Sequence, residues 1–165
     1  MTITSVPTIR EADQPGDLGW MVQAHGELYS AEFGWNTDLE AHIARIVADF
    51  ATAHDPARER AWIAELDGRR VGCVLCVRED DATARLRILL VDPAGRGHHL
   101  GDRLVQTCLD FACDAGYRRM VLWTNHPLTA ARRIYLDHGF ELVDEQPHTS
   151  YGHELVGQTY ARSLP

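Results

Sequence analysis

A strand, a glycine-punctuated connection and an amphipathic helix follow one another between residues 83 and 116, and this segment constrains the fold most strongly. Thr83–Val91 is typical of a largely buried strand, and Asp92–Gly101 is rich in glycine. The next stretch predicts a helix that ends at Gly116, with an apolar stripe made of Leu100, Leu104, Cys108, Phe111 and Ala112. Such a segment has to pack a helix directly against a sheet.

The first third of the chain predicts one short strand and two helices. Thr8–Glu11 has the pattern of a strand, and Asp17 is suited to cap a helix that runs through about Ser30. A loop over Ala31–Asn36 follows, and the next helix ends near Ala53. Thr37 and Glu40 have the spacing of a capping box at its start.

Strand patterns dominate after residue 60. Trp62–Leu66 and Val71–Val77 predict a hairpin around the turn Asp67-Gly68. The later elements are a strand at Arg119–Thr124, a helix at Leu128–His138 whose start tolerates Pro127, and strands at Phe140–Glu145 and Tyr151–Arg162. This order predicts an α/β (α+β) fold with a mixed, mostly antiparallel central sheet of about 6–7 strands flanked by about four helices.

Length and composition favour one packed domain over residues 1–165. The chain has 165 residues, of which 45% are hydrophobic and 24% are charged. No membrane-length apolar run is found, and Met1–Glu11 lacks the pattern of a signal peptide, so we expect a cytoplasmic protein. The net charge of −8 argues against nucleic acid and membrane partners and favours cationic ligands.

The basic residues and the cysteines exclude several kinds of chemistry. All 16 basic residues are arginine, which rules out a Schiff-base lysine and a lysine-bearing phosphate loop. Cys73 and Cys76 lie three apart in a predicted strand and therefore point to opposite faces. Cys108 and Cys113 do not complete a four-sulfur site, so we expect reduced, buried thiols and no metal.

The glycine-rich connection predicts an anion site. Its glycines let the backbone approach a ligand closely, and the N–H groups and dipole at the helix start attract phosphate oxygens. The segment lacks the Lys and Ser/Thr of G-x-x-x-x-G-K-[ST], and the glycines do not complete G-x-G-x-x-G. A strand–glycine–helix connection with a purely structural role is the alternative.

The segments Arg96–Gly101 and Ala131–Phe140 contain two motifs that resemble those of the GNAT superfamily of acyl-CoA N-acyltransferases. Arg96, Leu100 and Gly101 are in register with its pyrophosphate motif, Arg/Gln-x-x-Gly-x-Gly/Ala. Ala131, Tyr135 and Gly139-Phe140 match A-x-x-x-Y-x-x-x-G-F. The stretch from Leu89 through Tyr160 looks closest to acetyltransferase domains often fused to MarR-type regulators, but no helix-turn-helix precedes Thr8.

The resemblance implies a GNAT-like sheet and direct attack by a primary amine on the thioester of acetyl-CoA, with Tyr135 protonating the departing thiolate. The strand residues Leu89–Val91 would pair with the pantetheine amides, and the amides from Arg96 to Asp102 would hold the diphosphate. The expected cofactor-binding residues are Leu89, Leu90, Val91, Arg96, Gly97, His98, His99, Leu100, Gly101, Asp102, Asn125, Leu128, Ala131 and Arg132.

The sequence departs from the family pattern at three points. His99 stands where the motif has glycine, so either the local backbone is helical enough for a side chain or the diphosphate is seated differently. Leu128 replaces a frequent asparagine, for which Asn125 is a partial substitute. The strand at 83–88 lacks the usual glutamate, so the preferred bases are Glu27 and His148, ahead of His25, Glu32, Asp144, Glu145 and His153.

We expect the acceptor to contact Ala31–Asn36 and Gln146–Gly152, through Glu32, Phe33, Trp35 and Ser150. The aromatic residues there either contact an apolar amine or cap the core. The acceptor is a small-molecule amine or a protein amine. The alternatives to an enzyme are a non-catalytic acyl-CoA sensor or partner-binding module and, behind it, a toxin-like or structural domain. Leu155–Tyr160 could pair between the subunits of a homodimer or simply complete the sheet.

Overall fold

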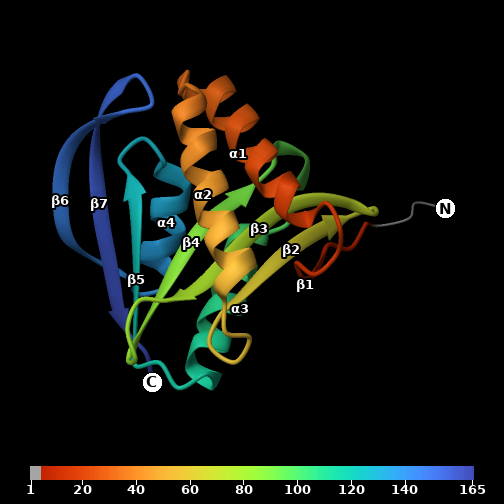
Figure 1. The fold of residues 1–165 in the computed structure, drawn as a ribbon, viewed down its shortest axis with the longest axis vertical. Coiled ribbons are helices and arrows are strands. Elements are labelled where there is room, and N and C mark those ends of the chain that lie inside the picture. The colour runs from red at the N-terminus through yellow and green to blue at the C-terminus, as the bar shows by residue number, and fades with distance from the viewer. Residues whose placement is uncertain (1–4) are drawn as a thin grey trace.

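The computed structural model describes residues 5–165, so the first four residues of the predicted domain, and of the segment inspected for a signal peptide, lie outside it. The described residues form seven strands and four α-helices (Figure 1). The strands are β1 (Thr8–Glu11), β2 (Arg60–Leu66), β3 (Arg69–Arg78), β4 (Thr83–Val91), β5 (Arg119–Asn125), β6 (Glu141–Ser150) and β7 (His153–Ser163). The helices are α1 (Asp17–Phe33), α2 (Thr37–Ala53), α3 (Leu100–Asp114) and α4 (Thr129–Asp137), and a short 3-10 turn, η1, covers Pro93–Gly95.

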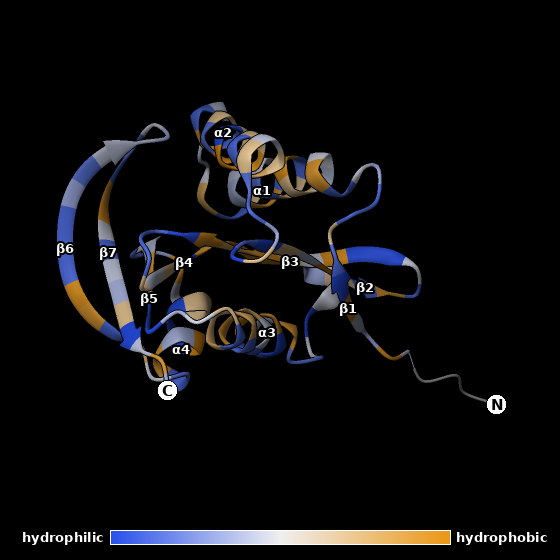
Figure 2. Cartoon of the chain, turned by 60° about the horizontal axis from the view of Figure 1, so that its bottom comes forward, coloured by the Kyte–Doolittle hydropathy of each residue, from blue (hydrophilic) through white to orange (hydrophobic). Residues whose placement is uncertain are grey.

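All seven strands belong to one sheet in the order β1-β2-β3-β4-β5-β7-β6. Neighbouring strands are antiparallel except β4 and β5, which are parallel. The helices α1 and α2 cover one face, and α3 and α4 cover the other (Figure 2). The predicted fold class is therefore confirmed.

Each face of the sheet has its own apolar core. Cys73 packs with residues of α1 and α2, whereas Cys76 packs with α3, as the alternation of side chains along β3 requires. All four cysteines are free, and three are buried, but Cys113 is only partly buried. Within residues 5–165 no group of three potential metal ligands comes together, and none of the helices is long and apolar enough to span a membrane.

The starts of α1 and α2 differ from the predicted caps. Gly16 is the N-cap of α1, in the left-handed conformation, while the buried Asp17 carboxylate binds Arg10 and Arg70. α2 is capped by Asn36, whose side chain accepts a hydrogen bond from the Asp38 amide, so the predicted capping box is wrong. Because the Asp17 carboxylate binds two arginines, it does not cap the backbone amides at the start of α1.

α1 also continues three residues beyond the predicted end at Ser30, which shortens the expected loop at 31–36. It stops at Gly34, which has φ 70° and donates its amide to the carbonyls of the last turn. Glu32 and Phe33 therefore belong to the last turn of α1. Only the last three residues of the expected loop, 34–36, join α1 to α2.

The sheet opens between β4 and β5. Only three residue pairs join these strands, from Thr83–Arg119 to Arg85–Val121, and beyond them β4 pairs with β3 alone while β5 pairs with β7. A β-bulge interrupts β4 against β3, and the bulged Ile88 has φ 50°. The bulge bends β4 where it leaves β5, so the second half of β4 borders an open wedge.

β6 and β7 form a long hairpin at one end of the sheet. Leu155–Tyr160 lies in β7, which pairs with β5 on one side and β6 on the other. The segment therefore completes the sheet, which was one of the two expectations, and the other, pairing between subunits, is wrong because both edges of this strand are already paired. β6 is the edge strand at this end, and most of its residues are exposed.

Candidate functional site

A groove of about 560 Å³ runs from the second half of β4, past the glycine-rich connection, to the start of α4. Its lining includes most of the expected cofactor residues: Leu89, Leu90, Val91, Arg96, Gly97, His99, Leu100, Gly101, Asp102, Leu128 and Ala131. Nine of these residues lie between positions 89 and 102, and the other two, Leu128 and Ala131, lie at the start of α4, which borders the same groove. The groove is the site in which a long, flexible ligand with a diphosphate would fit.

The floor of the groove offers unused amide donors. Within residues 5–165, no protein acceptor binds the backbone amides from Gly97 to Asp102, and α3 has no side-chain cap. The helix dipole adds positive potential at the same place. This arrangement has the chemistry of a phosphate cradle, and it fits the diphosphate of a coenzyme A ligand.

His99 keeps the backbone shape of the glycine it replaces. It has φ 55° and ψ 30°, in the left-handed region, so the first reading of this position, a helical backbone, is wrong. Its imidazole is exposed. A histidine in this conformation costs about 1 kcal/mol, and the fold retains it with the amides still facing the groove.

Three expected cofactor residues do not line the groove. His98 stands outside it, and Arg132 donates to the carbonyl of His126 at 3.0 Å and to Gln158. Asn125 lies instead in a second cavity. We predicted these three residues from their positions in the sequence, but the direction in which each side chain points depends on the residues that pack around it.

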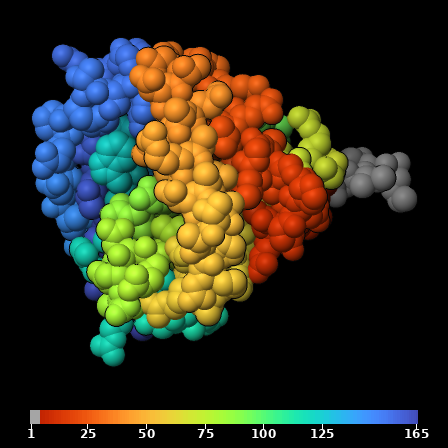
Figure 3. All heavy atoms as spheres, viewed as in Figure 1, coloured from red at the N-terminus to blue at the C-terminus, as the bar shows by residue number. Residues whose placement is uncertain are grey.

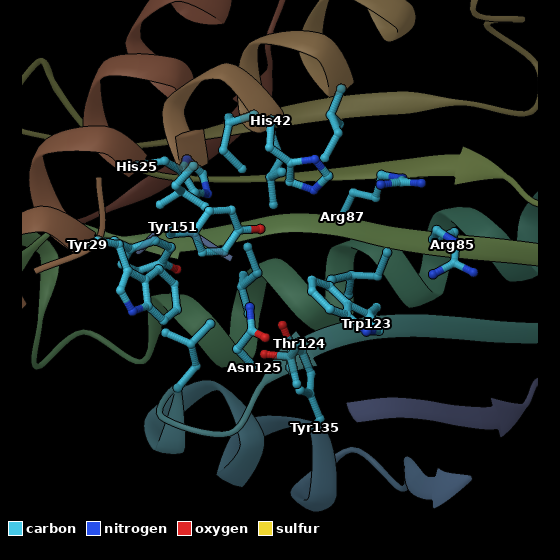
Figure 4. Close-up of a pocket in the computed structure, with 18 residues that line it drawn as sticks. His25, Tyr29, His42, Arg85, Arg87, Trp123, Thr124, Asn125, Tyr135 and Tyr151 are labelled. Carbon is cyan, nitrogen blue, oxygen red and sulfur yellow. The ribbon is translucent and has the colours of Figure 1, made fainter. Parts of the chain in front are cut away.

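The second cavity, the acceptor cavity, measures about 100 Å³ and lies in the wedge between β4 and β5, under α1 and α2. It shares Tyr29, Leu89 and Leu128 with the groove, so the two spaces adjoin. In Figure 3, cyan atoms are visible in a recess between the orange atoms of α2 and the blue atoms of the β6–β7 hairpin. Figure 4 shows the polar side chains that surround the cavity.

Tyr135 reaches the acceptor cavity from α4 (Figure 4). Its side chain is 5% exposed, and its ring packs against Phe140 and Tyr160. Among the described residues its hydroxyl has no hydrogen-bond partner, and burial raises the pKa of the phenol far above its usual value. The hydroxyl is therefore protonated at every ordinary pH and available to a ligand.

The two preferred bases do not line the acceptor cavity. Glu27 lies exposed on α1, where it accepts a hydrogen bond from Gln23 at 2.9 Å. His148 lies on β6, where Nε2 donates to Asn125 Oδ1 at 2.8 Å. His148 thus touches the acceptor cavity only through Asn125, and Ser150 is 2.9 Å from its Nδ1.

The expected acceptor residues divide between the two spaces. Trp35 is buried and lines the acceptor cavity, while Glu32 and Phe33 line the groove. Ser150 lines neither space and supports His148. Glu32 lies in the groove because α1 extends beyond Ser30 and brings its carboxylate to Arg96, with 2.5 Å between Oε1 and the guanidinium.

Several polar residues of the acceptor cavity were not predicted, among them His42, Arg85, Arg87 and Thr124. His25, a lower-ranked candidate base, and Tyr151, in the expected segment 146–152, also line it. Burial lowers the pKa of His25 to about 4, and its ring nitrogen Nδ1 donates to the Met21 carbonyl. Burial also lowers the pKa of His42, and the nearby charges of Arg87 and Arg45 lower it further. Among residues 5–165, no carboxylate lines this cavity.

Comparisons with known proteins agree with this geometry. Residues 22–140 match the Acetyltransferase (GNAT) family. The chain is 38% identical over 85 residues to the N-acetylaspartate synthetase of Danio rerio, covering 51% of this chain and 30% of that protein. It is 35% identical over 119 residues to human N-acetyltransferase 8, covering 68% of this chain and 52% of that protein. The chain thus spans well under two thirds of these relatives.

The fold also has solved counterparts. The acetyltransferase yncA of Salmonella typhimurium, whose structure contains its cofactor acetyl-CoA, superposes with a TM-score of 0.72 at 23% identity, covering 96% of this chain and 94% of that one. The match to the family extends over most of the chain and includes the β4–α3 connection and α4. The chain therefore belongs to the acetyltransferase (GNAT) family.

Proposed function

We propose that this chain is an N-acetyltransferase that moves the acetyl group of acetyl-CoA to a primary amine in a ternary complex. The observation that carries the proposal is the pair of adjoining spaces at the parted strands, one with free amides for a diphosphate and one with a buried phenol. Acetyl-CoA, when bound, supplies an activated thioester. The names of the relatives support acetyl transfer to nitrogen.

The described residues suit direct attack by the amine. The amine nitrogen forms a bond to the thioester carbonyl carbon, and the carbon–sulfur bond breaks. The Tyr135 hydroxyl, kept protonated by burial, donates its proton to the departing sulfur. The free edge of β4 at Leu89–Val91 offers backbone groups to the pantetheine amides.

The amine must also lose a proton, and His42 is suited to accept it. His42 lines the acceptor cavity, is half-buried, and has a lowered pKa, so its imidazole is neutral at pH 7. His25 also lines the cavity, but with a pKa near 4 it is a much weaker base. His42 therefore replaces Glu27 and His148 as our proposed general base.

Replacing Tyr135 tests the proposal. We expect Tyr135→Phe to lower kcat by about 100-fold, the usual loss for a general acid, and to leave the Kd for acetyl-CoA within about threefold. The measurements are thiol release with a panel of amines and calorimetric titration with acetyl-CoA. Tyr117→Phe is the matched control, because Tyr117 is another buried phenol but bonds the Arg58 carbonyl outside both cavities.

Two results would argue against the enzyme. Unchanged kcat in Tyr135→Phe would remove the acid role, and acetyl-CoA binding without thiol release from any amine would favour the acyl-CoA sensor. No binding of acetyl-CoA at all would favour the structural reading. A cytoplasmic location, a homodimer and the nearer resemblance to domains fused to MarR-type regulators stay predictions.

A further inference from the structure

The acceptor cavity carries positive charge although the chain as a whole has a net charge of −8. Arg85 and Arg87 line it, and no aspartate or glutamate of residues 5–165 does. The lining of the wedge between β4 and β5 thus contains arginine side chains and no carboxylate of the described residues, although acidic residues outnumber basic ones in the chain. The overall acidity favours a cationic acceptor, and this lining adds a place for an anionic group on the same molecule.

Arg87 is unusual among the arginines. Its side chain is half-buried, yet it makes no hydrogen bond or ion pair within residues 5–165. The neighbouring Arg85 is bound by Glu79 through two contacts of 2.6 and 3.1 Å. In the described part of the chain, every other arginine without a partner is exposed, and every other half-buried arginine has one.

The surroundings of Arg87 do not neutralise it. Burial and the charge of Arg85 lower the pKa of Arg87. The charges of Glu79 and Asp49 raise this pKa, but neither carboxylate forms a hydrogen bond or an ion pair with the guanidinium. Glu79 is already engaged by Arg85. Partial burial of a guanidinium without a hydrogen-bond partner costs desolvation free energy. A bound anion would offset this cost through charge-assisted hydrogen bonds.

We propose that Arg87 holds an anionic group of the acceptor, so that the acceptor is a small amine that also carries a carboxylate, as an amino acid does. The proposal rests on the proposed function, because it assigns the second substrate of the same site. Figure 4 shows Arg87 beside His42, with Trp123, Asn125 and Tyr135 across the cavity. The carboxylate would lie at Arg87 and the amine between His42 and Tyr135.

The size of the acceptor cavity supports a small molecule. At about 100 Å³ it has room for a compact amine, and its walls include aliphatic and aromatic groups such as Ile43, Leu86 and Trp123. A guanidinium holds a carboxylate through two parallel hydrogen bonds, which fixes the orientation as well as the charge. A polyamine or the side chain of a lysine would bring a second cation or no anion to Arg87.

Matched pairs of probes test the charge requirement. Alanine, leucine and phenylalanine are each compared with the corresponding amino acid amide, by acetyl transfer and by calorimetric binding to the protein saturated with CoA. We expect the carboxylate member of the best pair to be preferred, and Arg87→Gln to reduce its kcat/KM and its affinity by about 10- to 100-fold. The amide should change by less than about threefold.

Arg45→Gln is the control variant. Arg45 is exposed on α2, close enough to act on His42 but not part of the cavity lining, so the variant removes the same charge without removing the contact. It should retain the preference for the carboxylate. Arg87→Lys keeps the charge but not the guanidinium, and we expect it to recover only part of the preference.

The two readouts separate this inference from the proposed function. Binding of a carboxylate probe that is lost in Arg87→Gln, without acetyl transfer, would support the anion site and overturn the enzyme. Equal use of both members of each pair, or an undiminished preference in Arg87→Gln, would overturn the anion site and leave the enzyme standing. Binding of neither member of any pair would also overturn it.

Discussion

The buried imidazole of His25 should make the stability of the protein depend on pH between 7.5 and 5. His25 is 1% exposed, and burial lowers its pKa to about 4, against about 6.5 in an unfolded chain. As the pH falls through 6.5, the unfolded chain gains a proton that the folded one does not. At pH 5 the resulting loss of stability is about 2 kcal/mol relative to pH 7.5.

Urea unfolding followed by tryptophan fluorescence measures this loss. With an m-value of roughly 2 kcal/mol/M, the midpoint of the wild-type protein should fall by about 1 M from this group alone. In His25→Asn the amide N–H takes the place of Nδ1–H toward the Met21 carbonyl, and nothing titrates. We expect this variant to be less stable at pH 7.5 and to lose about 2 kcal/mol less than wild type at pH 5.

The comparison of the two proteins isolates His25, because other groups titrate in both. A difference in stability between wild type and His25→Asn that stays constant within about 0.5 kcal/mol from pH 7.5 to 5 would refute the reasoning. It would mean that the imidazole accepts a proton in the folded state at nearly its ordinary pKa.

Two further predictions concern the acceptor cavity. His42→Gln should lower kcat/KM by about 10- to 100-fold at pH 7. In the wild-type protein the acid limb of the pH profile of kcat/KM should lie below the ordinary pKa of histidine, and the variant should lack this limb. An unchanged profile would exclude His42 as the base. Gly157→Ala would place a methyl group 2.6 Å from Trp123 Nε1, so we expect the indole to move and its fluorescence to change. The kcat/KM for the acceptor should fall, while the Kd for acetyl-CoA should stay within about twofold of wild type. Unaltered fluorescence and acceptor use would show that the ring adapts freely.

Much of the fold could be predicted because its elements are marked locally. The bounds of β1 and β4 were predicted to the residue, and the Asp67-Gly68 turn lies between β2 and β3 as expected. The helix starts were harder to predict, because residues distant in sequence decide them. Arg70, which lies on β3, engages Asp17 and leaves the α1 start to Gly16.

The groove could be predicted for the same reason, since the amides of the β4–α3 connection are consecutive in the chain. The acceptor cavity could be predicted only in part, through Trp35 and Tyr135, because its walls come from α1, α2, β4, β5, α4 and the β6–β7 turn. Arg87 has the pattern of an outward residue in an alternating strand, and His42 that of a polar position on an amphipathic helix. These two residues become neighbours only in the folded chain, where α2 and β4 line the same cavity.

The short pairing between β4 and β5 divides the sheet into two parts that only three residue pairs join directly. Near Thr83–Arg85 the parallel pairing and the amides of Arg118 and Arg119, which donate to Ala82, hold the parts together. Beyond them the β5-facing amides of β4 have no strand beside them, so they should exchange with deuterium quickly. A ligand that pairs with this edge would slow that exchange and raise the Tm by mass action, with no change elsewhere in the fold.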